Sequence, residues 1–286
     1  MKEKGKHFAI ADTRIYVAER GEGYPVFVLH GGSGSDHHSW GNSLDSLCDE
    51  FKLLLLDLRG HGLSDEVSED TLTLKQMAKD VVLLADAMNI KKYAVFGHSF
   101  GAFVALQNAV DFPGKASQTI LSGCIPSAHY LYDSLKKNMK TIEPKELRQQ
   151  IARSWELEKE VKTVEEFEKM NEDQRPWHFA NLKDSRIQKS RKNTKAILKP
   201  YIMRYFARHE YGGIEVEDHL HLVKQPTLVL VGRYDRTCPL EAAQSIAGGI
   251  PNASLVVFEN SGHATRVEEN EAYISTIRDF INKHRF

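Results

Sequence analysis

Residues 97–101 read Gly97-His98-Ser99-Phe100-Gly101, and this stretch decides the fold of the chain. An apolar run at 93–96 precedes it and predicts a buried strand, and a second apolar run at 102–106 predicts a helix. A serine at a sharp strand-to-helix turn projects toward a base, and flanking glycines let the strand and the helix approach without Cβ clashes. The stretch therefore predicts a nucleophilic serine. The competing interpretation is a glycine-rich turn that carries an incidental serine.

A serine nucleophile needs a base and an acid that orients the base, and both follow other predicted strands. Asp235 comes directly after a buried strand at 227–231, and His263 lies in the loop after an apolar strand at 255–258. In open parallel sheets ligands bind outside the carboxyl ends of the strands, where all three side chains would lie. We therefore predict Ser99, Asp235 and His263 as catalytic residues. The alternative for Asp235 is a cap of the helix that begins near Pro239.

Strands and helices alternate along the chain, which predicts an α/β fold with a mostly parallel central sheet flanked by helices. Further strands are expected near 25–30, 52–57, 92–97 and 117–122, and helices at 37–50, 73–88 and 268–283. After residue 125 the strand signals vanish, and charged, helix-permissive sequence takes over until about residue 222. We therefore divide the chain into a first core part, a helical insertion and a second core part that carries the acid and the histidine. These are residues 1–125, 126–222 and 223–286.

Four glycine-containing motifs occur along the chain in a fixed order. They are His30-Gly31-Gly32, Gly97 to Gly101, Gly232 to Asp235, and Gly262-His263. With the chain order of Ser99, Asp235 and His263, these motifs make the sequence resemble the α/β-hydrolase family over nearly its whole length. The resemblance implies the α/β-hydrolase fold, in which the insertion at 126–222 forms a helical cap over the active site. It also implies serine-hydrolase chemistry.

The tetrahedral intermediate of such chemistry needs an oxyanion hole with two donors. One donor is expected to be the backbone N–H of Phe100, and the other to come from the loop after the third strand, at Gly32 or Ser33. For the substrate pocket the candidates are His37, His38 and Trp177. Each has an alternative: the two histidines can start a helix, and the tryptophan can belong to a small core inside the cap.

Composition and charge limit the classes of partner that the chain is expected to bind. The formal net charge is −1 and the pI about 6.9, which argues against nucleic acid or an anionic membrane as the main partner. The three cysteines are odd in number and far apart, so reduced thiols and a cytoplasmic protein are expected. No cofactor is expected, since the chain has no phosphate-binding loop motif. No metal site is expected either, because Asp218-His219-Leu220-His221 lacks a third ligand cluster.

The substrate is expected to be a small-molecule ester or a short peptide. Within the family the motifs resemble the proline iminopeptidase-like and carboxylesterase branch, but Ser33 replaces the usual proline of that loop and Phe100 replaces the usual tryptophan. Three hypotheses remain: a carboxylic ester hydrolase, a proline iminopeptidase that holds the substrate's ammonium group with cap acids, and a ligand receptor on a hydrolase fold. The oligomeric state stays open.

Overall fold

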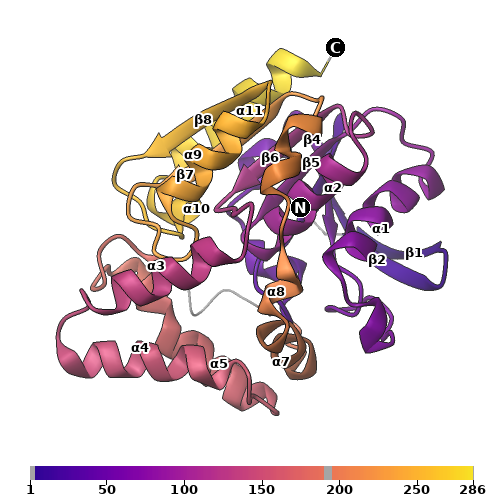
Figure 1. Ribbon diagram of the computed structural model, residues 1–286. Coiled ribbons are helices and arrows are strands. Elements are labelled where there is room, and N and C mark those ends of the chain that lie inside the picture. The colour runs from indigo at the N-terminus through magenta and orange to yellow at the C-terminus, as the bar shows by residue number, and fades with distance from the viewer. Residues whose placement is uncertain (1–3, 190–194, 286) are drawn as a thin grey trace.

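The computed structural model describes residues 4–189 and 195–285. Its centre is an eight-stranded sheet in the order β1-β2-β4-β3-β5-β6-β7-β8 (Figure 1). The strands are Lys4–Ile10 (β1), Thr13–Arg20 (β2), Tyr24–Leu29 (β3), Phe51–Leu56 (β4), Ala94–His98 (β5), Gln118–Ser122 (β6), Thr227–Gly232 (β7) and Ala253–Phe258 (β8). β1 and β2 pair antiparallel, and so do β2 and β4, whereas every pairing from β4 to β8 is parallel. This confirms the predicted α/β fold.

Helices cover both faces of the sheet. One face packs against α1 (Leu74–Ala87), α2 (Phe100–Asp111) and α9 (Leu240–Gly249), and the other against α11 (Asn270–His284). Successive strand residues alternate between the faces: Phe27 joins the first cluster, whereas Val26 and Val28 join the second. Because both faces of the sheet are covered, most residues of the parallel strands are apolar, which is why short apolar runs predicted them.

The predicted helix at 37–50 is wrong. The structure has two short 3₁₀ helices there, His37–Trp40 (η1) and Asp45–Leu47 (η2). Gly41 ends the first with a φ of 54°, which favours glycine and interrupts helical geometry. Trp40 and Leu47 are buried in the cluster that also holds α11. The apolar side chains of this segment therefore reach the core without a continuous helix.

The segment between β6 and β7 is helical. It holds α3 (His129–Met139), α4 (Lys145–Leu157), α5 (Val164–Gln174), η4 (Arg175–His178), α6 (Arg186–Lys189), α7 (Pro200–Arg208), α8 (Glu210–Gly213) and η6 (Glu217–Leu222). In Figure 1 most of it lies below the sheet, with α4, α5 and α7 at the lower edge of the molecule, whereas the chain after α8 rises again toward the sheet. It has small apolar clusters of its own, one around Phe167 and Met170 and one around Trp177. We interpret this segment as a cap.

Two short elements complete the described chain, Glu69–Thr71 (η3) before α1 and Thr265–Glu268 (α10) between β8 and α11. Among the helices of the described residues, none has the length and apolar character that crossing a membrane requires.

Candidate active site

Ser99 lies at the turn between β5 and α2. It is the N-cap residue of α2 with a φ of 52° and a ψ of −122°, a left-handed conformation that is strained for a residue with a Cβ. The flanking glycines make the turn possible: a Cβ on Gly97 would lie 2.2 Å from the Gly101 carbonyl oxygen, and a Cβ on Gly101 would lie 2.3 Å from the carbonyl oxygen of Leu29. The strain and the close approach are those of a nucleophile turn.

Asp235 and His263 meet beyond the ends of β7 and β8. His263 Nδ1 lies 2.7 Å from Asp235 Oδ2, and both residues are 6% exposed. The other oxygen of Asp235 accepts hydrogen bonds from the backbone N–H groups of Thr237 and Cys238, both at 2.8 Å. These bonds fix the carboxylate, so the imidazole presents Nε2 outward.

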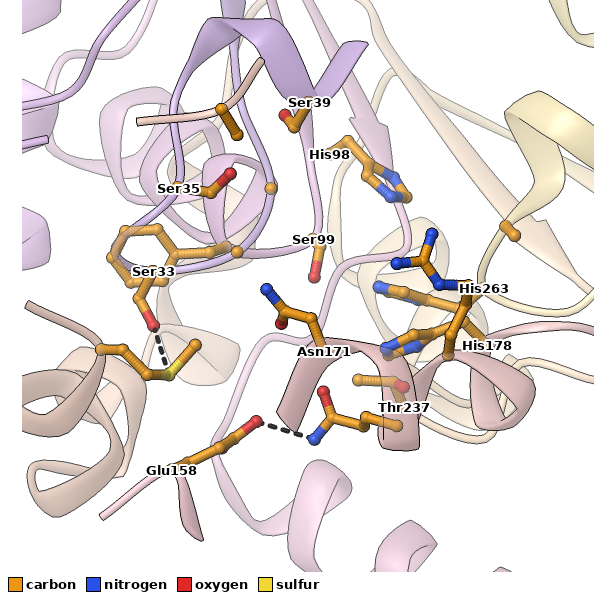
Figure 2. Close-up of a pocket in the computed structure, with 18 of the residues that line it drawn as sticks. Ser33, Ser35, Ser39, His98, Ser99, Glu158, Asn171, His178, Thr237 and His263 are labelled. Carbon is orange, nitrogen blue, oxygen red and sulfur yellow. Dashed lines mark hydrogen bonds between the residues drawn. The ribbon is translucent and has the colours of Figure 1, made fainter. Parts of the chain in front are cut away.

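Ser99 and His263 line one cavity of about 690 Å³ (Figure 2). No hydrogen bond of 3.5 Å or less joins Ser99 Oγ to His263 among the described residues, and such contacts commonly tighten only when substrate binds. The ring centroids of His98 and His178 lie 5.0 and 5.3 Å from that of His263. Burial lowers the pKa of both rings well below the usual value, and the positive charges nearby lower it further. Both are therefore neutral at neutral pH.

The loop after β3 closes against the serine. A Cβ on Gly31 would lie 3.2 Å from the Ser99 Cβ, so this glycine lets the loop approach Ser99 closely. Gly32 has a φ of 74°, and the hydroxyl of Ser33 donates to Met203 Sδ at 3.5 Å. Gly32 and Ser33 line the cavity together with Phe100, which begins α2. The first N–H groups of a helix have no intrahelical acceptor, so the Phe100 N–H is available to an oxyanion.

Three predicted pocket residues lie elsewhere. His37 is 1% exposed, and its Nδ1 lies 2.6 Å from Asp57 Oδ1. His38 Nδ1 lies 2.8 Å from Asp36 Oδ2. Trp177 is fully buried in the cap, where its indole N–H donates to Thr237 Oγ1 at 3.1 Å. None of the three lines the cavity. The structure thus assigns the histidines to a buried acid network and the tryptophan to the cap's own core.

The cavity wall contains residues that the sequence did not single out. Glu158 is 3% exposed, and it accepts hydrogen bonds from Gln174 Nε2 at 2.8 Å and from the Tyr211 hydroxyl. Burial raises its pKa to about 7, although these bonds oppose the shift. Asn171 and Arg266 line the same cavity. Nothing in the acid-rich segment separates Glu158 from its exposed neighbours, whereas Arg266 carries a signal, since it follows His263 by three residues.

Among the described residues, one group of side chains could offer ligand atoms to a metal ion. It consists of Asp36, His37 and His38, whose ligand atoms all lie within 4.8 Å of one another. Asp36 Oδ2 already accepts hydrogen bonds from His38 Nδ1 and, at 3.0 Å, from the backbone N–H of Ile197 in the cap. His37 Nδ1 is engaged by Asp57. The hydrogen bonds alone explain this grouping as a brace between the loop and the cap.

Comparisons with known proteins agree with this architecture. A family profile described as the alpha/beta hydrolase fold matches residues 24–269. A proline iminopeptidase of Pestalotiopsis fici is 27% identical, with 90% of this chain and 92% of that protein covered. A pimeloyl-[acyl-carrier protein] methyl ester esterase of Aliivibrio fischeri is 25% identical, with 95% and 99% covered.

Among solved structures, an alpha/beta fold family hydrolase from Bacillus anthracis superposes with a TM-score of 0.80 at 23% identity, covering 97% of this chain and 99% of that one. The likeness extends over the sheet and the cap alike. Since the family profile spans most of the residues and the relatives align almost from end to end, the chain belongs to the α/β hydrolase family.

Proposed function

We propose that the protein is a serine hydrolase that cleaves a small carboxylic ester through an acyl-enzyme. The observation that carries this proposal is the strained Ser99 turn, which opens into the same cavity as a histidine already paired with a buried aspartate. Family membership supports hydrolysis in general, and the esterase among the relatives supports an ester as substrate. A cavity of about 690 Å³ is of the size that holds small molecules.

The proposed reaction follows from the geometry. Ser99 Oγ attacks the carbonyl carbon while His263 Nε2 takes its proton, and Asp235 holds the ring tautomer and stabilises the imidazolium. The backbone N–H of Phe100, with a second donor from the loop at Gly32 or Ser33, stabilises the oxyanion. His263 then protonates the leaving alcohol. Water, with His263 as base again, releases the acid and restores Ser99.

A second candidate, a proline iminopeptidase, is favoured by one specific observation. Glu158 places a buried carboxyl group in the cavity wall, and Figure 2 shows it on the opposite side of Ser99 from Ser39 and His98. A carboxylate in such a position can hold the ammonium group that an aminopeptidase substrate carries. The proline iminopeptidase among the relatives supports this reading.

The test combines labelling of the nucleophile with turnover. A fluorophosphonate probe should label Ser99, and not Ser33, Ser35 or Ser39, which line the same cavity. Ser99→Ala should abolish labelling and turnover, whereas the matched variant Ser35→Ala should retain both. Folded protein that is not labelled would contradict the proposal. It would favour a hydrolase-fold receptor, in which ligand binding survives both Ser99→Ala and His263→Ala.

Turnover of an ester and of a prolyl anilide separates the two candidate functions. Faster turnover of p-nitrophenyl butyrate than of proline p-nitroanilide supports the esterase. The reverse preference supports the iminopeptidase, provided that Glu158→Gln lowers turnover of the anilide more than that of the ester. An anilide preference that survives Glu158→Gln would contradict the role assigned to this carboxyl group.

A further inference from the structure

Arg266 lies in α10, three residues after His263, and lines the cavity that Ser99 opens into. Its guanidinium packs over the Trp40 ring, with Cζ 5.5 Å from the ring centroid. Its Nη2 donates to the backbone carbonyl of Ser39 at 3.2 Å. These two contacts hold the charged group beside Ser39 and Trp40.

The guanidinium of Arg266 has no acidic partner among the described residues. Other arginines of this protein are paired: Arg59 contacts Asp80 at 2.7 Å, and Arg186 contacts Asp184 at 2.6 Å. The Nε of Arg266 is buried and has no hydrogen-bond partner within residues 4–189 and 195–285. A guanidinium offers five N–H donors and stays charged at neutral pH. A buried donor or charge without a partner destabilises the folded protein, so its retention in the cavity wall points to a ligand.

The surroundings of Arg266 favour an anion over a neutral ligand. The neighbouring rings of His98 and His178 are neutral, because burial and the charge of Arg266 itself lower their pKa. The cavity's acids belong to the cap, at Glu158 and on the exposed face of α5. One end of the cavity is therefore cationic, and it is the end from which His263 acts.

We infer that Arg266 binds a carboxylate of the substrate, so that the protein acts on acyl esters carrying a second, ionised carboxyl group. This inference rests on the proposed serine-hydrolase function. The planar fork of a guanidinium matches a carboxylate with two parallel hydrogen bonds, and no acid among the described residues pairs with the guanidinium of Arg266. A half-ester of a dicarboxylic acid is the simplest substrate of this class.

The experiment compares two esters that differ in charge, p-nitrophenyl butyrate and mono-p-nitrophenyl succinate. The wild-type protein should prefer the succinate in kcat/KM. In Arg266→Gln the ratio of succinate to butyrate should fall by about 10- to 100-fold, chiefly through KM, as expected for the loss of a charged hydrogen-bonded pair. Arg266→Lys should recover part of the ratio. Two control variants should leave the succinate-to-butyrate ratio unchanged. They are Arg175→Gln, at another arginine of the cavity wall, and Arg153→Gln, on the exposed face of α4.

An unchanged ratio in Arg266→Gln, or a fall produced by Arg175→Gln instead, would overturn the inference while the esterase function stands. If neither ester is turned over, a binding measurement still tests the role of Arg266. Calorimetry of monomethyl succinate with Ser99→Ala and with Ser99→Ala/Arg266→Gln should show at least about 10-fold weaker binding to the double variant. Equal affinity would overturn the inference, whereas absent labelling of Ser99 would overturn only the hydrolase proposal.

Discussion

Among the described residues, two aspartate–histidine pairs have both partners buried, and they differ in what surrounds them. Asp57 Oδ1 lies 2.6 Å from His37 Nδ1, and Asp235 Oδ2 lies 2.7 Å from His263 Nδ1. The first pair is closed off, with His37 stacked on Tyr16 at 5.5 Å. The second opens onto the cavity beside a strained serine. Acid–base chemistry needs access to substrate as well as an oriented imidazole, so only the second pair can serve catalysis.

Replacing the two histidines should therefore have opposite effects. His263→Gln should lower kcat for p-nitrophenyl butyrate by roughly 10³-fold or more, because the base is lost. His37→Gln should retain most of kcat and instead lower the free energy of unfolding by roughly 3 kcal/mol, since buried Asp57 loses its imidazole partner and keeps only backbone N–H donors. Steady-state kinetics and urea denaturation measure the two effects. A loss of kcat in folded His37→Gln as large as that in His263→Gln would contradict this division.

Glu158 makes stability depend on pH in a defined direction. Burial raises its folded-state pKa to about 7, above the ordinary value of 4.5, so the folded protein binds this proton more tightly than the unfolded chain. Ionising Glu158 in the folded protein therefore lowers the free energy of unfolding. This loss of stability is absent below the pKa of the unfolded chain, grows as the pH rises toward 7, and is complete above pH 7. Glu158→Gln should therefore stabilise the protein by up to about 3 kcal/mol at pH 8 and by almost nothing at pH 4. Thermal melts across this range test it; a constant difference would contradict it.

At the scale of elements, packing tolerances differ between glycines that look alike in sequence. Gly101 is the second residue of α2, where the helix touches β3, and a Cβ there would lie 2.3 Å from the backbone carbonyl oxygen of Leu29. Gly248 lies in the last turn of α9, and a Cβ there would meet nothing within 4 Å. The helix predicted at 37–50 fails for a different reason, which is backbone conformation and not lack of space. Its apolar spacing was compatible with a helix, but Gly41 has a φ of 54° and divides the segment.

Alanine substitution should separate these two glycines. Gly101→Ala should destabilise the protein by roughly 3 kcal/mol, because backbone atoms of β3 cannot move aside without disturbing the sheet. Gly248→Ala should stabilise it by about 0.5–1 kcal/mol through helix propensity. Chemical denaturation measures both variants. Equal effects of the two substitutions would show that the close approach of α2 to β3 is not rigid.

At the scale of the whole molecule, the cap is attached to the core through the loop that carries Asp235. The guanidinium of Arg236 donates to three backbone carbonyls of the cap, those of Trp177, Phe179 and Ala180, at 3.3, 2.6 and 3.1 Å. A further hydrogen bond joins the histidine loop to the cap: the Ala264 N–H donates to the His178 carbonyl at 2.8 Å. The acid loop, the histidine loop and this stretch of the cap therefore support one another.

Removing Arg236 should loosen the cap. Arg236→Gln should lower the free energy of unfolding by about 2–3 kcal/mol, since charged hydrogen bonds to buried carbonyls are lost, and it should speed limited proteolysis within the cap. The matched control is Arg233→Gln, whose side chain is 39% exposed and pairs with the exposed Glu259. That pair should contribute less than about 1 kcal/mol. Equal loss in the two variants would contradict the role of Arg236 in holding the cap.

Local sequence was enough to predict the parallel core and to select Ser99, Asp235 and His263 as candidates. Most of the buried strands are short apolar runs, and each candidate follows its strand within a few residues. Because β5, β7 and β8 run parallel, the candidates lie at the same edge of the sheet. The cavity wall was decided by tertiary structure. Glu158 and Arg266 are 108 positions apart by residue number, and nothing in the local pattern of Glu158 separates it from the exposed charges nearby. The same limit applied to His37, His38 and Trp177, because burial and cavity access depend on how the cap packs against the sheet and not on residue type.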